Sequence, residues 1–515
     1  MYLGIDLGTS EIKVLLLDAA GTIVGTAGEP LTVSRPHPGW SEQTPEDWWQ
    51  ATTAAIGKLR DTAPEAFAAT RAIGLSGQMH GAVLLDARNR VLRPAMLWND
   101  TRSTAECLEL TRRVPNLHAV AGNLAMPGFT APKLLWSARH EPDVFSAIDC
   151  VLLPKDYLRL RLTGERASDP SDAGGTLWLD MARRTWSDEL LAATGLSCSQ
   201  MPRLVEGSAP SGTLLPAVAD AWGLPRGVVV AGGGGDGAAS AVGIGATQPG
   251  DGFLSLGTSG VIFVVNDRFR PNPAQAVHAF CHALPGRWHQ MSVMLSAASC
   301  LRWFCRLTSV PEATLLPEIA ALAESERQSA PFFLPYLSGE RTPHNDAFAQ
   351  GHFHNLTHAS DRAALGYAVL EGVAFGMADG LDALRAAGTQ VASLSFVGGG
   401  SRSPFWAQLL ADTLNTELTT HVGSEAGGAL GAARLGWMAD GGVEAAVCAK
   451  PPVQATYRPD AARHARLAER LSTFRALYRR ASPLPVAPSA QTSDLPLPAC
   501  PTPCPCPASS SLAKR

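Results

Sequence analysis

Two short stretches of the chain carry the same four residues between apolar segments, and both could bind an anion. Leu-Gly-Thr-Ser occurs at residues 7–10 and again at residues 256–259. Glycine lets the backbone turn tightly and approach a ligand closely, and the amides and hydroxyls of such a turn can donate hydrogen bonds to phosphate oxygens. An ordinary hairpin turn uses the same residue types, but two copies favour phosphate binding by two related domains. The candidate phosphate contacts are Gly8, Thr9, Ser10, Gly257, Thr258 and Ser259.

Two aspartates next to glycine-containing turns could serve phosphoryl transfer. Asp6 ends the first apolar stretch, where its carboxylate could hold Mg²⁺, an ion that prefers one or two carboxylates together with phosphate oxygens. Asp236 follows four glycines in the segment VVVAGGGGDGAASAVG. Phosphoryl transfer needs positioning, charge neutralisation and often a carboxylate that accepts the proton of the attacking hydroxyl, which is a role that Asp236 fits. An aspartate that merely caps a helix after a flexible turn has the same local pattern.

A third glycine-rich turn could approach a flat ligand such as adenine. It lies in LSFVGGGSRSPFWAQLLAD, where a strand-like segment is followed by Gly398, Gly399, Gly400 and Ser401 and then by a helical segment. The pattern does not fit the G-x-G-x-x-G motif of dinucleotide-binding proteins. Since glycines often only separate secondary-structure elements, this motif alone is weak evidence for a ligand.

Polar residues that follow two further apolar stretches could form a sugar pocket. The segments are SGQMHGAV and LWNDTRS. Amide and carboxylate groups suit the hydroxyls of a polyol, and an aromatic face suits its carbon atoms. A lone histidine is more often a structural residue, so the pattern leaves both roles open for this one. The candidate sugar contacts are Met79, His80, Trp98, Asn99, Asp100 and Arg102.

The elements that position these residues alternate between strand and helix patterns, which predicts an α/β fold. Strands are expected at YLGIDLG, EIKVLLLD and AIGLSG, and a helix at residues 45–61. The pattern restarts near residue 247, so we expect one domain at residues 1–246 and a second at 247–480, the latter ending in a short helix after residue 467. Residues 481–515 are rich in proline and hold Cys500, Cys504 and Cys506, which predicts a disordered tail.

Composition restricts the class of protein. The chain has 515 residues, of which 46% are hydrophobic and 17% charged, with a net charge of −4. These values indicate a soluble globular protein and do not favour a nucleic-acid partner. No apolar run of the length of a membrane helix is evident, and the strand pattern begins at the N-terminus without a signal peptide. We therefore expect a cytoplasmic protein with no membrane partner.

Taken together, these residues resemble the FGGY family of carbohydrate kinases, and within it the xylulokinases of bacterial type. The likeness extends over about residues 1–480, through MYLGIDLGTS, LTVSRPHPGWSEQTPEDWWQAT, GQMHGAVLLD, DPSDAGGTLWLD and FLPYLSGERTPHN. It implies two ribonuclease-H-like domains of the actin, hexokinase and heat-shock-chaperone type, which flank a central cleft. The implied reaction converts D-xylulose and MgATP into D-xylulose 5-phosphate and ADP, and a homodimer is an option for the assembly.

The resemblance also implies roles for single residues. Asp236 would take the proton of the sugar hydroxyl, and Asp6 would work with Mg²⁺. Met79 and His80 would contact xylulose, and Lys13 would face the phosphates. The turn from Gly398 to Ser401 would lie beside the adenosine.

One departure from the family pattern concerns the substrate. Gly237 follows Asp236, whereas kinases that resemble this chain usually carry an asparagine there, a plausible sugar contact. A kinase of the same fold for L-ribulose or glycerol therefore stays open, as does a non-catalytic sugar-binding member of the family. The retained Asp6 and Asp236 favour an enzyme.

Overall fold

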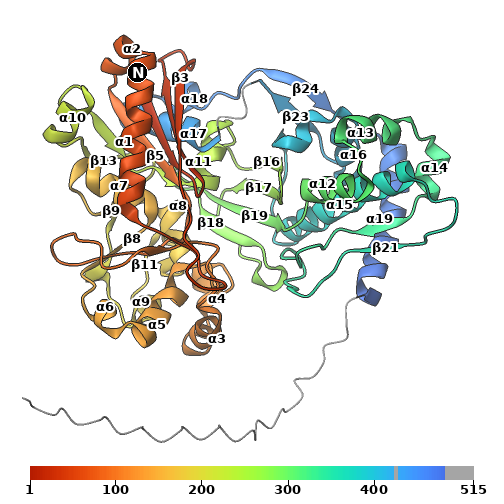
Figure 1. Cartoon of the computed structure of the whole chain (residues 1–515), viewed down its shortest axis with the longest axis horizontal. Coiled ribbons are helices and arrows are strands. Elements are labelled where there is room, and N and C mark those ends of the chain that lie inside the picture. Colours follow the sequence, from red (N-terminus) through yellow and green to blue (C-terminus); the bar gives the residue numbers. More distant parts are fainter. Residues whose placement is uncertain (423–426, 482–515) are drawn as a thin grey trace, which may run out of the picture.

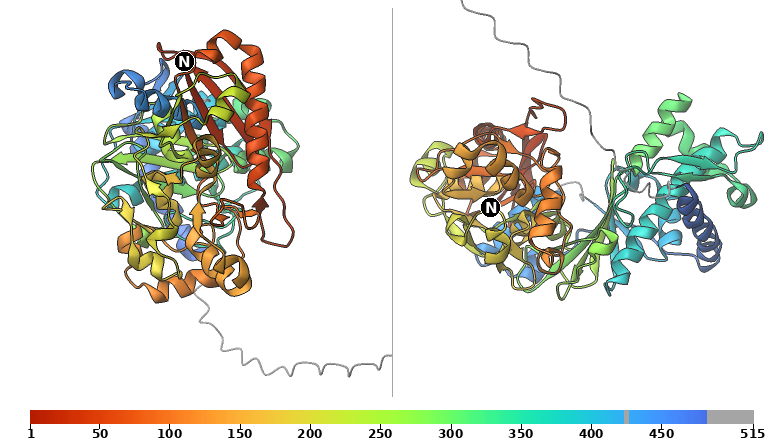
Figure 2. Two further views of the ribbon diagram at one scale, coloured as in Figure 1. Left: turned by 90° about the vertical axis from the view of Figure 1, so that its left-hand side faces the viewer. Right: turned by 90° about the horizontal axis from the view of Figure 1, so that it is seen from below.

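The computed structural model describes residues 1–422 and 427–481, and the expected disordered tail with its three cysteines lies outside the described residues. Two lobes stand side by side, as Figure 1 and the right-hand view of Figure 2 show. Each lobe is built around a seven-stranded sheet. The expected fold class is therefore confirmed.

The first sheet has the strand order β13-β14-β5-β1-β2-β3, with β15 paired to β5. Strand β1 runs antiparallel to β2 and parallel to β5. Helix α1 (Pro45–Thr62) packs on β2 and β3. The strands are β1 (Tyr2–Leu7), β2 (Glu11–Leu17), β3 (Ile23–Pro30), β5 (Ala72–Gly77), β13 (Pro210–Thr213), β14 (Val229–Ala231) and β15 (Gly234–Gly235).

The second sheet repeats this arrangement in the order β18-β19-β17-β16-β22-β23-β24. Here too an antiparallel pair, β16 and β17, is followed on its other side by a parallel neighbour, β22. The two Leu-Gly-Thr-Ser turns join β1 to β2 and β16 to β17, so they occupy equivalent places in the two sheets. The strands are β16 (Asp251–Leu256), β17 (Gly260–Asn266), β18 (His278–Cys281), β19 (Trp288–Met294), β22 (Ser393–Val397), β23 (Leu418–His421) and β24 (Val453–Tyr457).

Helices of the second lobe pack around α15 (Arg362–Ala386), which contacts α12 (Ala298–Thr308), α13 (Glu312–Ala321) and α16 (Pro404–Leu414). By length and composition α15 could cross a membrane, an apolar run that the sequence analysis did not expect, but 89% of its most apolar window is buried inside the protein. It is a core helix of this lobe.

The last described helix, α19 (Ala461–Ala481), begins earlier than the sequence predicts. Asp460 precedes it and accepts a hydrogen bond from the amide of Arg463 at 2.8 Å. Only Leu467 and Phe474 are buried along the helix, so its first turns carry no apolar pattern that could mark them as helical.

Helix α17 (Gly427–Ala439) lies between β23 and β24 of the second sheet in the sequence but packs on the first sheet, against β1, β5 and α11 (Asp236–Gly243). In Figure 1 it lies beside the strands of the first lobe. A Cβ atom built on Gly4 would lie 1.9 Å from the carbonyl oxygen of Ala429, and one on Gly74 would lie 1.7 Å from that of Ala432. The contact is therefore made by backbone against backbone. Helix α17 is therefore part of the first lobe, although the rest of that lobe is formed mainly by residues 1–246.

This packing predicts the effect of a single methyl group. We expect Gly74→Ala to lower the free energy of unfolding by about 1–3 kcal/mol or more, because overpacking displaces a rigid helix. In the control Gly57→Ala, the added Cβ of a helical residue meets nothing within 4 Å, so this variant should gain about 0.5–1 kcal/mol. Thermal unfolding of both variants measures the difference. Equal melting temperatures would contradict the proposed close contact.

Candidate active site

The carboxyl ends of three neighbouring parallel strands meet at one edge of the first sheet. Strand β5 lies between β1 and β15 and runs parallel to both. Asp6 stands near the end of β1, Met79 and His80 follow β5, and Asp236 follows β15. Open α/β sheets bind their ligands at this edge. The fold thus brings together residues that lie far apart in the sequence.

A cavity of about 1220 Å³ lies between the two lobes in front of this edge. From the first lobe it is lined by Met79, His80, Trp98, Asp236 and Gly237. From the second lobe it is lined by His278, Phe280 and Arg341 and, farther along, by Gly398, Gly399, Ser401, Arg402, Gln454 and Tyr457. The cavity therefore connects the expected sugar contacts with the expected adenosine turn.

Asp236 is the first residue of α11, and its carboxylate opens into the cavity. Its Oδ1 accepts a hydrogen bond of 2.7 Å from the amide of Gly237. The surrounding protein desolvates the carboxylate, and the nearby Asp6 adds a like charge, so the pKa of Asp236 rises to about 6. Such a carboxylate is ionised at neutral pH and is a better proton acceptor than an ordinary aspartate.

Asp6 lies between the first sheet and the start of α17. Its Oδ1 is buried and has no hydrogen-bond partner among the described residues. A Cβ atom on Gly428 would lie 2.7 Å from its Oδ2, and burial raises the pKa of Asp6. Lys13 stands opposite Asp6 on β2 and is largely exposed, with its Nζ 3.8 Å from a carboxylate oxygen of Glu11.

A hydrogen bond connects the first candidate phosphate loop with Trp98, one of the expected sugar contacts. The hydroxyl of Thr9 accepts a hydrogen bond from Trp98 Nε1 at 3.0 Å and donates one to Gln78 Oε1 at 3.0 Å. In the second loop, the hydroxyl of Thr258 accepts a hydrogen bond of 2.8 Å from Arg302. The two turns lie beside the cavity, and none of the following residues is part of its lining: Gly8, Thr9, Ser10, Lys13, Gly257, Thr258 and Ser259.

His80 is held in one orientation. Its φ of 69° lies in the left-handed region, which is uncommon for a residue with a side chain. Its Nδ1 is 2.7 Å from the carbonyl oxygen of Gly175, and burial lowers its pKa to about 3. A neutral ring must donate from Nδ1 to this carbonyl, which leaves Nε2 as an acceptor. His80 can therefore accept a hydrogen bond from a sugar hydroxyl.

The structure pairs Asp100 with Arg102, two of the expected sugar contacts. Both side chains are buried, Arg102 Nη2 lies 2.6 Å from Asp100 Oδ2, and its guanidinium is 3.5 Å from the ring centroid of Trp40. Asp100 also accepts a hydrogen bond of 2.7 Å from the amide of Ser41. Neither residue lines the cavity. Their buried ion pair supports the loop that carries Trp98.

The sequence did not predict that His278 and Arg341 of the second lobe line the same cavity as Met79 and His80. Arg341 Nη1 lies 3.3 Å from His278 Nε2, and both residues line the cavity. The ring of Phe129 stands 4.5 Å from that of His80 and 6.0 Å from that of His278. The motif FLPYLSGERTPHN contains Arg341. A charged residue in this motif was the signal that could have indicated a ligand contact.

Comparison with known proteins assigns the class. Residues 1–243 match the N-terminal domain and residues 252–439 the C-terminal domain of the FGGY family of carbohydrate kinases. The chain belongs to this family, and it is a carbohydrate kinase that uses ATP.

Several similar proteins are xylulose kinases. The chain is 54% identical over 94% of its length to the complete xylulose kinase of Escherichia coli (strain K12), and 52% identical over 94% to that of Klebsiella pneumoniae. A crystal structure titled as a xyloylose kinase from Brucella ovis is 52% identical, has a TM-score of 0.90, and covers 93% of this chain and 99% of its own.

The raised pKa of Asp236 predicts a pH dependence. A carboxylate that accepts a proton works in its ionised form, so with Asp236 as the base kcat/KM should fall as the pH drops through about 6, by about tenfold per pH unit below that value. Steady-state rates between about pH 4.5 and 8 in buffers of constant ionic strength test this, with a coupled assay verified at each pH. An acid limb only near pH 4, the ordinary range of aspartate, would contradict the assignment.

Proposed function

We propose that the protein transfers the terminal phosphoryl group of ATP to D-xylulose and forms D-xylulose 5-phosphate in the cytoplasm, as a step of pentose catabolism. The observation that carries this proposal is the position of Asp236 beside Met79 and His80 in the cleft between the lobes. The xylulose kinases at 52–54% identity support the choice of sugar. A homodimer stays a prediction.

In the proposed reaction, the sugar lies at the first-lobe end of the cavity. Asp236 accepts the proton of the terminal hydroxyl while that oxygen attacks the phosphorus atom. His80 accepts a hydrogen bond from another hydroxyl through Nε2, and Met79 packs on the turn before Asp236, where a Cβ on Gly235 would lie 2.8 Å from its Sδ. His278 and Arg341 approach the same space from the second lobe.

The nucleotide lies at the other end of the cavity. The turn from Gly398 to Ser401 follows β22 and would receive the adenosine. The turns at Thr9 and Thr258 would hold the phosphates through their amides, and Lys13 would offset part of the phosphate charge. Closure of the lobes around both substrates would exclude water that could otherwise attack ATP.

Asp6 is the residue that we propose to work with Mg²⁺. Its buried Oδ1 lacks a protein partner among the described residues, and a carboxylate facing the phosphates suits an ion that takes one or two carboxylates and several waters. When bound, Mg²⁺ neutralises charge on the phosphates. It would also relieve the repulsion between Asp6 and Asp236.

ADP release tests the proposed function directly. Purified protein is assayed with D-xylulose, L-ribulose, glycerol and no sugar, alongside Asp236→Asn. We expect turnover to be strongest with D-xylulose and to fall by at least about 10²-fold in the variant, the usual contribution of a general base. Greater turnover with L-ribulose or glycerol would contradict the choice of sugar, and no stimulation by any sugar would favour a binding protein.

Gly237 offers a second test of the sugar site. A Cβ atom there would meet only Met291 Sδ, at 3.4 Å, and the position has no positive φ, so Gly237→Asn should fold normally. The added amide would face the cavity and gain a hydrogen bond of about 1 kcal/mol to the sugar. We expect the KM for D-xylulose to fall about fivefold while the KM for MgATP stays unchanged. A change confined to MgATP would contradict this placement of the sugar.

A further inference from the structure

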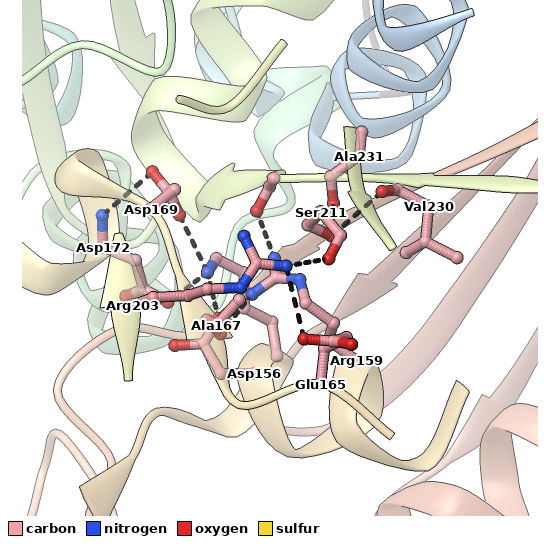
Figure 3. Close-up of polar contacts among 12 residues, drawn as sticks. Asp156, Arg159, Glu165, Ala167, Asp169, Asp172, Arg203, Ser211, Val230 and Ala231 are labelled. Atoms are coloured by element: carbon pink, nitrogen blue, oxygen red, sulfur yellow. Dashed lines mark hydrogen bonds and ion pairs between the residues drawn. The ribbon is translucent and has the colours of Figure 1, made fainter. Parts of the chain in front are cut away.

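A fully buried cluster of charged side chains lies behind the turn that carries Asp236. It consists of Lys155, Asp156 and Arg159 on α7 (Pro154–Thr163) and of Asp169 and Asp172 at α8 (Pro170–Ala173). Lys155 Nζ lies 2.6 Å from Asp156, 2.8 Å from Asp169 and 3.2 Å from Asp172. Figure 3 shows Asp156, Asp169, Asp172 and Arg159 of this charge cluster. None of its members lines the cavity.

The cluster joins two cations and three carboxyl groups in one buried space. Burial and the neighbouring carboxylates raise the pKa of Asp172 well above its usual range. Burial alone would also raise the pKa of Asp156, but Lys155 and Arg159 lower it. Because removing one partner would leave an unpaired buried charge, such a cluster fixes the geometry of its backbone neighbours.

Two contacts connect the cluster to the glycine turn between β14 and Asp236. Arg159 donates a hydrogen bond to the carbonyl oxygen of Gly232. At the other end of the turn, the amide of Gly235 donates to Ser171 Oγ at 3.1 Å. Ser171 is itself fully buried, and both its hydroxyl and its amide donate to Asp169 Oδ2. Lys155 holds the other oxygen of Asp169.

The turn is also held through its backbone. The amides of Gly232 and Gly233 each donate a hydrogen bond of 2.9 Å to a carbonyl oxygen, and the next two glycines pair with β5. Glycines are the least restricted residues in conformation, so the turn depends on such external contacts. The last of them, Gly235, directly precedes Asp236, so the hydrogen bond from its amide to Ser171 lies next to the proposed base. The same α8 segment continues to Gly175, whose carbonyl oxygen orients His80. The cluster therefore supports both the proposed base and the proposed sugar contact.

We propose that Ser171, anchored by Asp169 and the buried charge cluster, is a positioning residue for Asp236. It holds the amide of Gly235 and thereby keeps the carboxylate of Asp236 in line with the sugar hydroxyl. The inference rests on the proposed function, because it concerns the step in which Asp236 takes the proton. A displacement of about 1 Å in such a group can lower the rate by about 10²-fold.

The test compares Ser171→Ala with a matched control. Ser211 is also a buried serine, and its hydroxyl donates to the carbonyl oxygens of Val230 and Ala231 on β14 at 2.9 and 3.0 Å. Figure 3 shows Ser211 beside these two residues. We expect Ser171→Ala to lower kcat for D-xylulose about 10- to 100-fold with an unchanged KM for MgATP. Ser211→Ala should keep the normal kcat. Thermal unfolding confirms that both variants are folded.

A double variant separates positioning from a general structural role. If Ser171 acts through Asp236, adding Ser171→Ala to Asp236→Asn should leave the residual rate unchanged. A further loss equal to that in the wild-type background would overturn the inference, as would an equal loss of kcat in Ser211→Ala. Normal kcat in Ser171→Ala together with collapse in Asp236→Asn would overturn this inference alone. Full activity of Asp236→Asn would overturn the proposed base and the inference with it.

Discussion

The central constraint in this protein is the proximity of two carboxylates, Asp6 and Asp236, at one edge of the first sheet. The charge of each carboxylate opposes ionisation of the other, and desolvation by the surrounding protein opposes it further. Both effects raise the pKa of Asp236. The chain must hold both groups there before any cation or phosphate arrives. The strands, the glycine contacts and the buried charge cluster can all be understood as support for that arrangement.

Rigid backbone contacts provide part of this support. Helix α17 sits so close to β1, β5 and α11 that no side chain fits at Gly4, Gly74 or Gly431. The strand that carries Asp6 and the helix that begins with Asp236 are thereby packed against one common element. Since backbone atoms cannot change rotamer, such contacts fix distances more firmly than side-chain packing does.

The two ends of the cleft are built in different ways. The proposed sugar end combines fixed side chains from both lobes, with His80 oriented by Gly175 and with Arg341 beside His278. The proposed nucleotide end combines the glycine turn after β22 with side chains of the second lobe. A cavity with a polar end and an end that includes a glycine turn suits a kinase, which must select its sugar but recognises ATP mainly through phosphates and a flat base.

The class of fold, the repeated Leu-Gly-Thr-Ser turn, the two candidate aspartates and the family could be predicted from the sequence, because these depend on local pattern and on motif order along the chain. It also identified Met79, His80 and Trp98, which follow strand-like segments and do line the cavity. The start of α19 escaped it, because the first turns of that helix are exposed and carry no apolar period.

The remaining features depend on contacts between distant segments, so they emerged only in three dimensions. The fold returned α17 to the first lobe, paired Asp100 with Arg102 outside the cavity lining, and brought Arg341 to the cavity from more than 250 residues beyond His80. It also joined Lys155, Ser171 and Gly235 into one support for Asp236. Whether a charged side chain faces a substrate or another side chain is settled by the segments that fold against it, and a linear pattern does not contain that information.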